Sequence, residues 1–326
     1  MAAVLTRPRR GDSALAAGEI GRPASSRKWR RTSFPYALLA PIVIFEAIFV
    51  VYPIIKGAIL STETTQAGKT TFVGLANFRE MINNPTFWSS LTTTFEFTFS
   101  MVLVWLVLGL GVGLLMNWSF KGRSFIRGLL ALPWAIPDIP VVVTFTMMLD
   151  PNFGVLNRFI SLILGVNHHI QWFAVTDLAF LAIVMMVGWK GFPFFGLIFL
   201  ASLQGIPDDL YEAAQVDGAG MFRRFRYVTF PAILPTTVLL AVLAFIFSFQ
   251  QFTIIYLSTG GGPGVATSTL SVSIYLNAFE YFDYNYASAI AVVGLFLALV
   301  VTLLFIFVER RLARSQALET GAGALI

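Results

Sequence analysis

The chain has 326 residues, of which 57% are hydrophobic and 12% charged, whereas an ordinary soluble domain carries about 25% charged residues. A water-soluble fold of this length could not hide so much apolar surface, because the buried share of the surface rises only slowly with length. The composition therefore predicts an integral membrane protein. The absence of cysteine excludes disulfides, thiolate nucleophiles and thiolate metal sites.

Residues 1–33 are rich in arginine, alanine, glycine and serine, which predicts a disordered cytoplasmic tail. A cleaved signal peptide is the alternative, and its apolar stretch would be about 7 to 15 residues long. Here the apolar stretch from Ala37 to Val51 continues through Pro53 into a full span. We therefore expect an uncleaved first helix.

Six apolar runs come close to the roughly 20 residues that an α-helix needs to cross a bilayer. The predicted spans are Tyr36–Leu60, Phe95–Met116, Phe125–Leu149, Leu178–Leu203, Ala232–Leu257 and Tyr286–Val308. Several prolines lie inside these runs, where neighbouring helices can satisfy the backbone groups that a proline frees, so we predict kinks and not breaks. The expected membrane domain covers residues 34–314, and a cytoplasmic tail follows at 315–326.

Lysine and arginine alternate between rich and poor segments along these spans. The tail before the first span is rich in them, as are three later segments, with Lys121, Arg123 and Arg127 after the second span, Arg223, Arg224 and Arg226 after the fourth, and Arg310, Arg311 and Arg314 after the sixth. Cytoplasmic loops retain positive charge during insertion. The pattern therefore predicts both termini and the even-numbered loops in the cytoplasm, and it assigns the formal charge of +5 to the membrane face and not to nucleic acid binding.

The fourth loop, residues 204–231, has a composition unlike the other loops. Pro207 suits a helix entrance, the following aspartates complement a helix start, and Gly218 can take the left-handed conformation that ends a helix. These residues predict a short cytoplasmic helix from Asp208 to Asp217, and then a basic helical stretch from Met221 to Thr229. An interfacial helix on the headgroups and a docking helix for a cytoplasmic partner are both open at this point.

The run Glu212-Ala213-Ala214, with Asp217-Gly218-Ala219 and then Phe230-Pro231, resembles the EAA loop of ATP-binding cassette (ABC) importer permeases. It departs from the family pattern in having phenylalanine where leucine precedes the later proline. The resemblance implies a coupling helix that sits in a cleft of an ATPase subunit. Glu212 would pair with a basic group of the ATPase, and the implied coupling residues are Leu210, Glu212, Ala213, Ala214, Asp217 and Gly218.

Three further segments resemble the carbohydrate-uptake branch of these permeases, typified by the large permease subunit of the maltose transporter. They are Leu132-Pro133-Trp134-Ala135-Ile136-Pro137, Asn152-Phe153-Gly154-Val155-Leu156-Asn157 and Thr259-Gly260-Gly261-Gly262-Pro263. The resemblance implies an all-α, six-helix type I ABC importer permease fold in the inner membrane of a prokaryote. The maltose subunit carries a large external insert, whereas Ser61–Leu91 here predicts only a short loop.

The same resemblance implies the partners of the chain. They are a second permease subunit in a heterodimer, two ATP-binding cassette ATPase subunits, an extracytoplasmic solute-binding protein and a sugar. It implies that this chain binds no cofactor, and that the ATPase subunits use the ATP and magnesium.

Polar side chains in the middle of a membrane are costly and usually face a cavity or a partner. The residues of this kind are Glu46, Glu96, Asp138, Lys190, Gln250 and Gln251. Ordinary pairing with other helices is an open alternative for Glu46 and Glu96. Lys190 is expected to snorkel toward the outer interface and is left outside the predicted site.

Sugar recognition combines aromatic rings with amide, hydroxyl or carboxylate groups. Ser248 and Gln251 are three residues apart in the fifth span, so we expect them on one helix face, bordered by Phe247. Ordinary interhelical hydrogen bonding is the alternative. The resemblance to the maltose subunit favours a sugar site and adds Trp134, Asp138 and Phe194. Asp138 replaces a hydroxyl residue there and Phe194 a tyrosine, so the ligand need not be maltose.

A secondary or proton-coupled transporter is the alternative function, because Glu46, Glu96 and Asp138 could act as intramembrane acids. The sequence shows no internal repeat, and an EAA loop has no role in such a carrier. A membrane enzyme is disfavoured because no nucleophile motif or phosphate-binding glycine loop is present, and the pair His168-His169 has no visible set of metal-ligand partners. We therefore expect no catalytic and no metal-binding residues, and ATP hydrolysis only in partner subunits.

Overall fold

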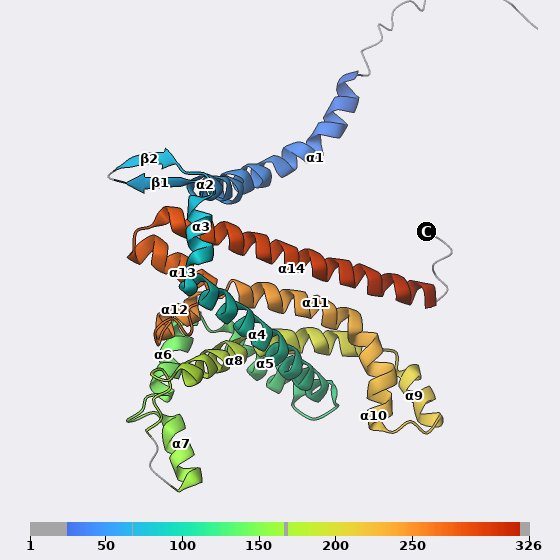
Figure 1. Cartoon of the computed structure of the whole chain (residues 1–326). Coiled ribbons are helices and arrows are strands. Elements are labelled where there is room, and N and C mark those ends of the chain that lie inside the picture. The colour runs from blue at the N-terminus through green and yellow to red at the C-terminus, as the bar shows by residue number, and fades with distance from the viewer. Residues whose placement is uncertain (1–24, 67, 166–168, 320–326) are drawn as a thin grey trace, which may run out of the picture. The chain divides into compact units, whose positions relative to one another are not determined.

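The computed structural model describes residues 25–66, 68–165 and 169–319 (Figure 1). Its backbone divides into two compact units, one up to Ile55 and one from Lys56. Each unit is described by itself below. Most of the predicted tail at 1–33 lies outside the described residues.

The first unit is helical throughout its described part. It consists of α1 (Ser25–Glu46), the π-helical turn η1 (Ala47–Val51) and the start of α2 (Tyr52–Leu60). The run Pro35–Leu60 is long and apolar enough to cross a membrane, in agreement with the predicted first span. Helix α1 begins at Ser25, so the end of the predicted tail is helical.

Two π-helical turns stand directly before prolines. A proline lacks the amide that an α-helix needs, and its ring clashes with the carbonyl group four residues earlier. A wider turn relieves that clash within a continuous helix. Accordingly η1 ends two residues before Pro53, and η2 (Phe225–Thr229) ends two residues before Pro231. Both prolines therefore lie in helices that continue, which confirms the prediction made for Pro53.

The second unit contains the other helices and a hairpin. The helices are α3 (Ala76–Asn83), α4 (Pro85–Asn117), α5 (Arg123–Ala135), α6 (Asp138–Met148), α7 (Val155–Leu164), α8 (Thr176–Gln204), α9 (Asp208–Val216), α10 (Met221–Arg224), α11 (Phe230–Phe249), α12 (Thr253–Thr259), α13 (Leu270–Tyr275) with its π-helical end η3 (Leu276–Glu280), and α14 (Tyr284–Glu319). Within the described residues of the whole chain, five helical runs can cross a membrane, and the bent pair α5–α6 makes a possible sixth.

The segment predicted as a short loop, Ser61–Leu91, is more ordered than expected. It forms an antiparallel hairpin of β1 (Glu63–Gln66) and β2 (Lys69–Phe72), then α3 and the start of α4. The buried side chain of Asn77 in α3 donates hydrogen bonds to the carbonyl oxygens of Ser61 and Glu63, at 2.8 and 2.9 Å. This short hairpin is an addition to the predicted all-α fold class, since the other described elements are helices.

The core of the second unit is centred on α4 and α8, which pack closely because glycines of α4 face the backbone and Cβ atoms of α8. A Cβ atom at Gly109 would lie 2.7 Å from the Cβ atom of Phe195, and one at Gly113 would lie 2.9 Å from that of Phe199. Both phenylalanines are fully buried. Small residues allow such close approach between helices in a membrane, where lipid offers no hydrophobic drive for association.

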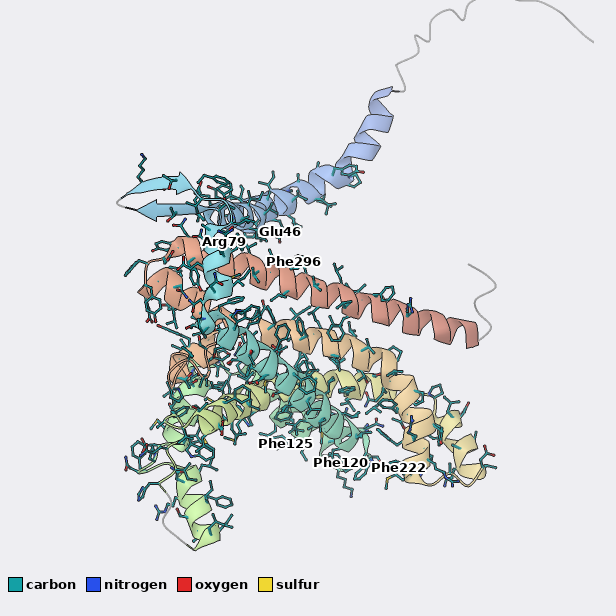
Figure 2. All side chains as sticks on the ribbon, viewed as in Figure 1. Glu46, Arg79, Phe120, Phe125, Phe222 and Phe296 are labelled. Atoms are coloured by element: carbon teal, nitrogen blue, oxygen red, sulfur yellow. The ribbon has the colours of Figure 1, made fainter. Side chains whose placement is uncertain are left out.

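The basic loops of the second unit lie at one end of it. Figure 1 shows the α4–α5 turn, the α9–α10 segment and the last turns of α14 together, with α7, α12 and the hairpin at the opposite end. Phe120, Phe125 and Phe222 mark the first of these ends in Figure 2. Phe125 and Phe222 are each 77% exposed. The loops that the sequence marks as rich in lysine and arginine therefore share one end of the second unit, and the loops poor in them share the other.

Candidate functional site

The third predicted span is broken, not kinked. Helix α5 ends at Ala135, and α6 starts at Asp138 at an angle of 94° to it. Pro137 causes the break, because a proline pushes the residue before it into an extended conformation, and Ile136 has a ψ of 130°. The prediction of a mere kink is wrong here. The break places Asp138 in the first turn of α6, where the partial positive charge of the helix start favours a carboxylate.

Asp138 pairs with Lys190 in the middle of α8. The ammonium nitrogen Nζ of Lys190 lies 3.0 Å from Oδ1 of Asp138, and the two side chains are 21% and 30% exposed, respectively. Lys190 was expected to snorkel outward and was left out of the predicted site. The structure corrects this expectation, because its charged end turns to a carboxylate on a neighbouring helix.

The fifth span also ends earlier than expected. Helix α11 stops at Phe249, and Gln250 and Gln251 form a turn before α12. Ser248 is buried, and its hydroxyl donates to the carbonyl oxygens of Ala244 and Phe245 in its own helix, at 2.6 and 3.2 Å. Ser248 and Gln251 therefore do not share a helix face, contrary to the expectation.

These elements line an open cavity of about 360 Å³. Its lining comes from α4, α5, α6, α8, the end of α11 and α12, and consists of Trp105, Trp134, Asp138, Val187, Lys190, Gly191, Phe247, Gln250, Gln251 and Ile254. Trp134, Asp138, Phe247 and Gln251 are the predicted site residues among them. Phe194 lies behind the lining, with its ring centroid 5.7 Å from that of Trp134 and 5.9 Å from that of Phe247.

Trp105 and Gly191 were not singled out from the sequence. The indole nitrogen Nε1 of Trp105 donates to the carbonyl oxygen of Val187 at 3.2 Å, and its ring stacks on Phe195. A side chain at Gly191 would overlap that indole, so only glycine leaves it room. The polar lining residue Gln250 could be found from the sequence because it is a polar residue in an apolar run, whereas Trp105 carries no such signal among 7 tryptophans.

The chemistry of this cavity suits a small polar ligand with apolar faces. Its volume falls in the range of about 300 to 1,000 Å³ that is usual for small-molecule sites. Tryptophan and phenylalanine rings offer flat surfaces, and the two glutamines, the carboxylate and the ammonium group offer donors and acceptors. The cavity can therefore hold several hydroxyl groups at once.

The predicted coupling segment forms the helix α9, one residue shorter than expected. Gly218 has a φ of +75°, which confirms its left-handed conformation. The amide groups of Gly218 and Ala219 donate to the carbonyl oxygens of Gln215 and Ala214, at 3.0 and 2.9 Å, in the pattern of a Schellman helix end. The left-handed conformation favours glycine at this position.

The side chains of α9 are mostly exposed. Glu212 is exposed and has no ion-pair partner among the described residues. Leu210, Ala213, Asp217 and Gly218 are also exposed, and Ala214 is half-buried. The hydroxyl groups of Tyr211 and Thr229 lie 3.0 Å apart and tie α9 to η2. The helix is thus held at its base and presents Glu212 outward.

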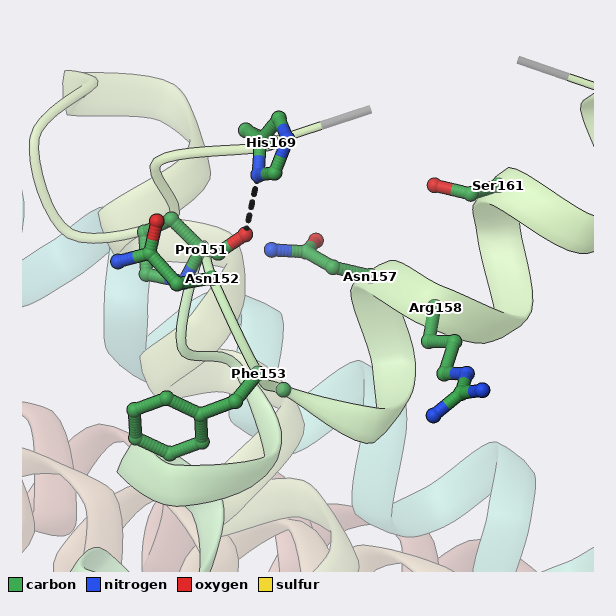
Figure 3. Close-up of a pocket in the computed structure, with 8 residues that line it drawn as sticks. Pro151, Asn152, Phe153, Asn157, Arg158, Ser161 and His169 are labelled. Carbon is green, nitrogen blue, oxygen red and sulfur yellow. Dashed lines mark hydrogen bonds between the residues drawn. The ribbon is translucent and has the colours of Figure 1, made fainter. Parts of the chain in front are cut away.

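A second cavity, of about 350 Å³, lies beside the start of α7 (Figure 3). Nδ1 of His169 lies 2.9 Å from the carbonyl oxygen of Pro151, and Arg158 and Asn152 also line the cavity. His168 lies outside the described residues. Among the residues that are described, no group of three or more histidine, aspartate or glutamate side chains could hold a metal ion.

Comparison with known proteins agrees with this architecture. Residues 105–317 match the family model of the binding-protein-dependent transport system inner membrane component. The trehalose/maltose transport system permease protein MalF of Thermococcus litoralis is 37% identical over 79% of this chain and 86% of that protein. The sulfoquinovosyl glycerol transport system permease protein SmoG of Agrobacterium fabrum is 37% identical over 84% of this chain and 89% of that protein.

A solved structure shares the fold. It is a bacterial alginate ABC transporter in complex with alginate pentasaccharide-bound periplasmic protein, and one of its chains superimposes with a TM-score of 0.78 at 23% identity, covering 87% of this chain and 96% of that one. The family match runs from Trp105 in α4 into α14, and so includes both the cavity and the predicted coupling segment. This chain therefore belongs to the family of binding-protein-dependent transport system inner membrane components, the multi-pass permeases of ABC importers.

Proposed function

We propose that this permease carries a sugar or a sugar-like solute inward across the cytoplasmic membrane of a prokaryote, driven by ATP hydrolysis in partner subunits. The lining of the cavity supports the solute class, because aromatic faces and planar amides are the groups that recognise sugars. The names of the relatives support it too, since they include trehalose/maltose and sulfoquinovosyl glycerol transport systems.

The observation that carries the proposal is the course of α11. This helix continues without interruption from α10 and η2, beside the coupling segment, to Phe249 at the cavity. The bond between Tyr211 and Thr229 fixes α9 to its beginning, and Gln250 and Gln251 follow at its end. A displacement of α9 by an ATPase would therefore reach the solute site through one continuous helical run.

The proposed assembly has a second permease subunit, two ATPase subunits that use ATP and magnesium, and an extracytoplasmic solute-binding protein. Both termini and the α9–α10 segment lie in the cytoplasm in this scheme, where positive charge is retained. Glu212 meets a basic group of the ATPase, with Leu210, Ala213, Ala214, Asp217 and Gly218 shaping the contact. The permease pair alternates between outward and inward openings as the ATPases close and reopen.

Reconstitution of the complete complex in liposomes tests this function. We expect ATP-driven uptake of a sugar by the wild type and its loss in Glu212→Ala and Gly218→Pro, because a proline cannot adopt a positive φ. The matched control is Gln215→Ala, an exposed residue on the same helix. All three variants should reach the membrane in normal amounts. Undiminished uptake by both Glu212→Ala and Gly218→Pro would contradict the coupling role.

The alternative, a secondary transporter, makes the opposite forecast for the isolated chain. Purified protein in liposomes without any ATPase would then move the solute along an ion gradient. We expect no such flux. Flux without ATPase subunits would overturn the proposed mechanism and leave the cavity as the solute site.

A further inference from the structure

The charge of the transported solute is left open by family membership. The transport systems named for the relatives include trehalose/maltose, whose solutes are neutral, and sulfoquinovosyl glycerol, whose sulfonate group makes the solute an anion. The cavity itself carries information on this point, because its lining contains two charged side chains, Asp138 and Lys190.

These two charges cancel each other at short range. Nζ of Lys190 and Oδ1 of Asp138 are only 3.0 Å apart, so a ligand that reaches one group also lies near the other. The eight other lining residues are uncharged. The helix ends balance as well, since the positive starts of α6 and α12 and the negative ends of α5 and α11 all border the cavity.

An anionic ligand would gain little in such a place. Its attraction to Lys190 would be offset by repulsion from Asp138, while it would still lose its hydration. A neutral polyhydroxylated ligand loses less hydration and can use both groups, because its hydroxyls donate to the carboxylate and accept from the ammonium group. The pair therefore offers two strong, charge-assisted hydrogen bonds without demanding a charge from the ligand.

The two groups come from separate elements that the fold holds in place. Asp138 stands at the break after Pro137, and Lys190 precedes Gly191, where the indole of Trp105 fills the space that a side chain would take. The ring of Trp134, at the end of α5, belongs to the same lining. A flat apolar surface and a pair of opposite charges thus face one cavity.

From this geometry we infer that the Asp138–Lys190 pair is a specificity device, which selects neutral sugars or polyols against sugar acids and sugar phosphates. Lys190 is thereby assigned to the solute site as a hydrogen-bond donor. This inference rests on the proposed function and narrows its solute class.

The test measures solute binding to the permease directly, so that the selectivity of a solute-binding protein does not affect the result. The complex of both permease subunits and the ATPases is placed in nanodiscs without binding protein. A panel of neutral mono- and disaccharides and their 6-phosphates is titrated by calorimetry, with quenching of tryptophan fluorescence as a second readout. We expect the wild type to bind at least one neutral sugar about tenfold or more tightly than its phosphate.

The variants have opposite signatures. Asp138→Asn leaves the ammonium group unpaired, so binding of the phosphate should rise and the preference should shrink or invert. Lys190→Gln leaves the carboxylate alone, so the neutral sugar should bind more weakly and the phosphate should not gain. Glu96→Gln is the matched control, because Glu96 is an exposed carboxylate on α4 outside the cavity lining. It should behave as the wild type does.

The outcomes separate this inference from the proposed function. Wild-type binding of a phosphate as tight as or tighter than that of its neutral sugar, or equal selectivity in Asp138→Asn and wild type, would overturn the role of the pair. Absence of binding by every neutral sugar would do the same. ATP-driven uptake of a sugar phosphate in liposomes would then support the proposed importer function and contradict the inferred preference for neutral solutes.

Discussion

The hydroxyl groups of Tyr211 in α9 and Thr229 in η2 lie 3.0 Å apart and join α9 to the helical run that reaches the cavity. Thr229 is buried, with 5% of its surface exposed. A buried hydroxyl that loses its partner costs about 1–3 kcal/mol. Loss of this contact should therefore destabilise the chain and weaken the attachment of α9 to η2.

We predict that Tyr211→Phe lowers the stability of the chain in detergent and the ratio of transport to ATP hydrolysis in the assembled complex. Thr229→Val should have the same two effects. The double variant should be less impaired than the sum of the single ones, because no buried hydroxyl then remains unpaired. Thermal unfolding and coupled transport assays on the four proteins measure this cycle, and simple additivity would show that the two hydroxyls act independently.

Close packing of α4 on α8 gives a second prediction. Gly109→Ala should destabilise the chain by about 1–3 kcal/mol, because the added methyl group would force the backbone of α8 away. Gly111→Ala, two residues further along the same helix, is the control, since a Cβ atom there meets nothing within 4 Å. Thermal unfolding in detergent measures both, and equal stability of the two variants would contradict the packing described.

Much of this fold could be read from the sequence, because long apolar runs leave few alternatives in a membrane. The position of the Gly218 turn followed from local backbone chemistry, in which only glycine takes a positive φ at little cost. The break at Pro137 could not be distinguished from a kink, since prolines of similar appearance at 53 and 231 are absorbed by π-helical turns. Whether a proline breaks a span or only bends it depends on the groups that neighbouring helices offer to the freed backbone, and the local sequence does not show these groups.

The candidate cavity was predictable in part for the same reason. Polar residues in apolar runs drew attention to Asp138, Lys190, Gln250 and Gln251, all of which line it. Their pairing was not predictable, because Asp138 and Lys190 meet only through the break in one span and the packing of another. Ser248 was predicted as a site residue but does not line the cavity, because its hydroxyl bonds to the backbone of its own helix. The sequence does not distinguish such a serine from one that faces a cavity.

A third prediction follows from that contrast between neighbouring polar residues. Gln251→Ala should reduce sugar-stimulated ATP hydrolysis by the assembled complex about tenfold or more, because an amide that faces the cavity is lost. Ser248→Ala should stay close to the wild type, since its hydroxyl bonds within α11. Sugar-stimulated ATPase rates compare the two, and an equal loss in both would return Ser248 to the solute site.

The last prediction concerns the orientation of the chain in the membrane. Because the chain has no cysteine, a thiol reagent reacts only with a cysteine that is introduced. Gln215 in α9 and Val265 in the loop between α12 and α13 are both exposed. Figure 1 shows α9 at the opposite end of the second unit from α12 and α13. With α9 in the cytoplasm, a membrane-impermeant thiol reagent added to intact cells should label Val265→Cys and spare Gln215→Cys. Inverted vesicles should show the reverse, and the cysteine-free parent gives the background. Labelling of Gln215→Cys from outside would place α9 away from any ATPase, so it would contradict the topology and the coupling role together.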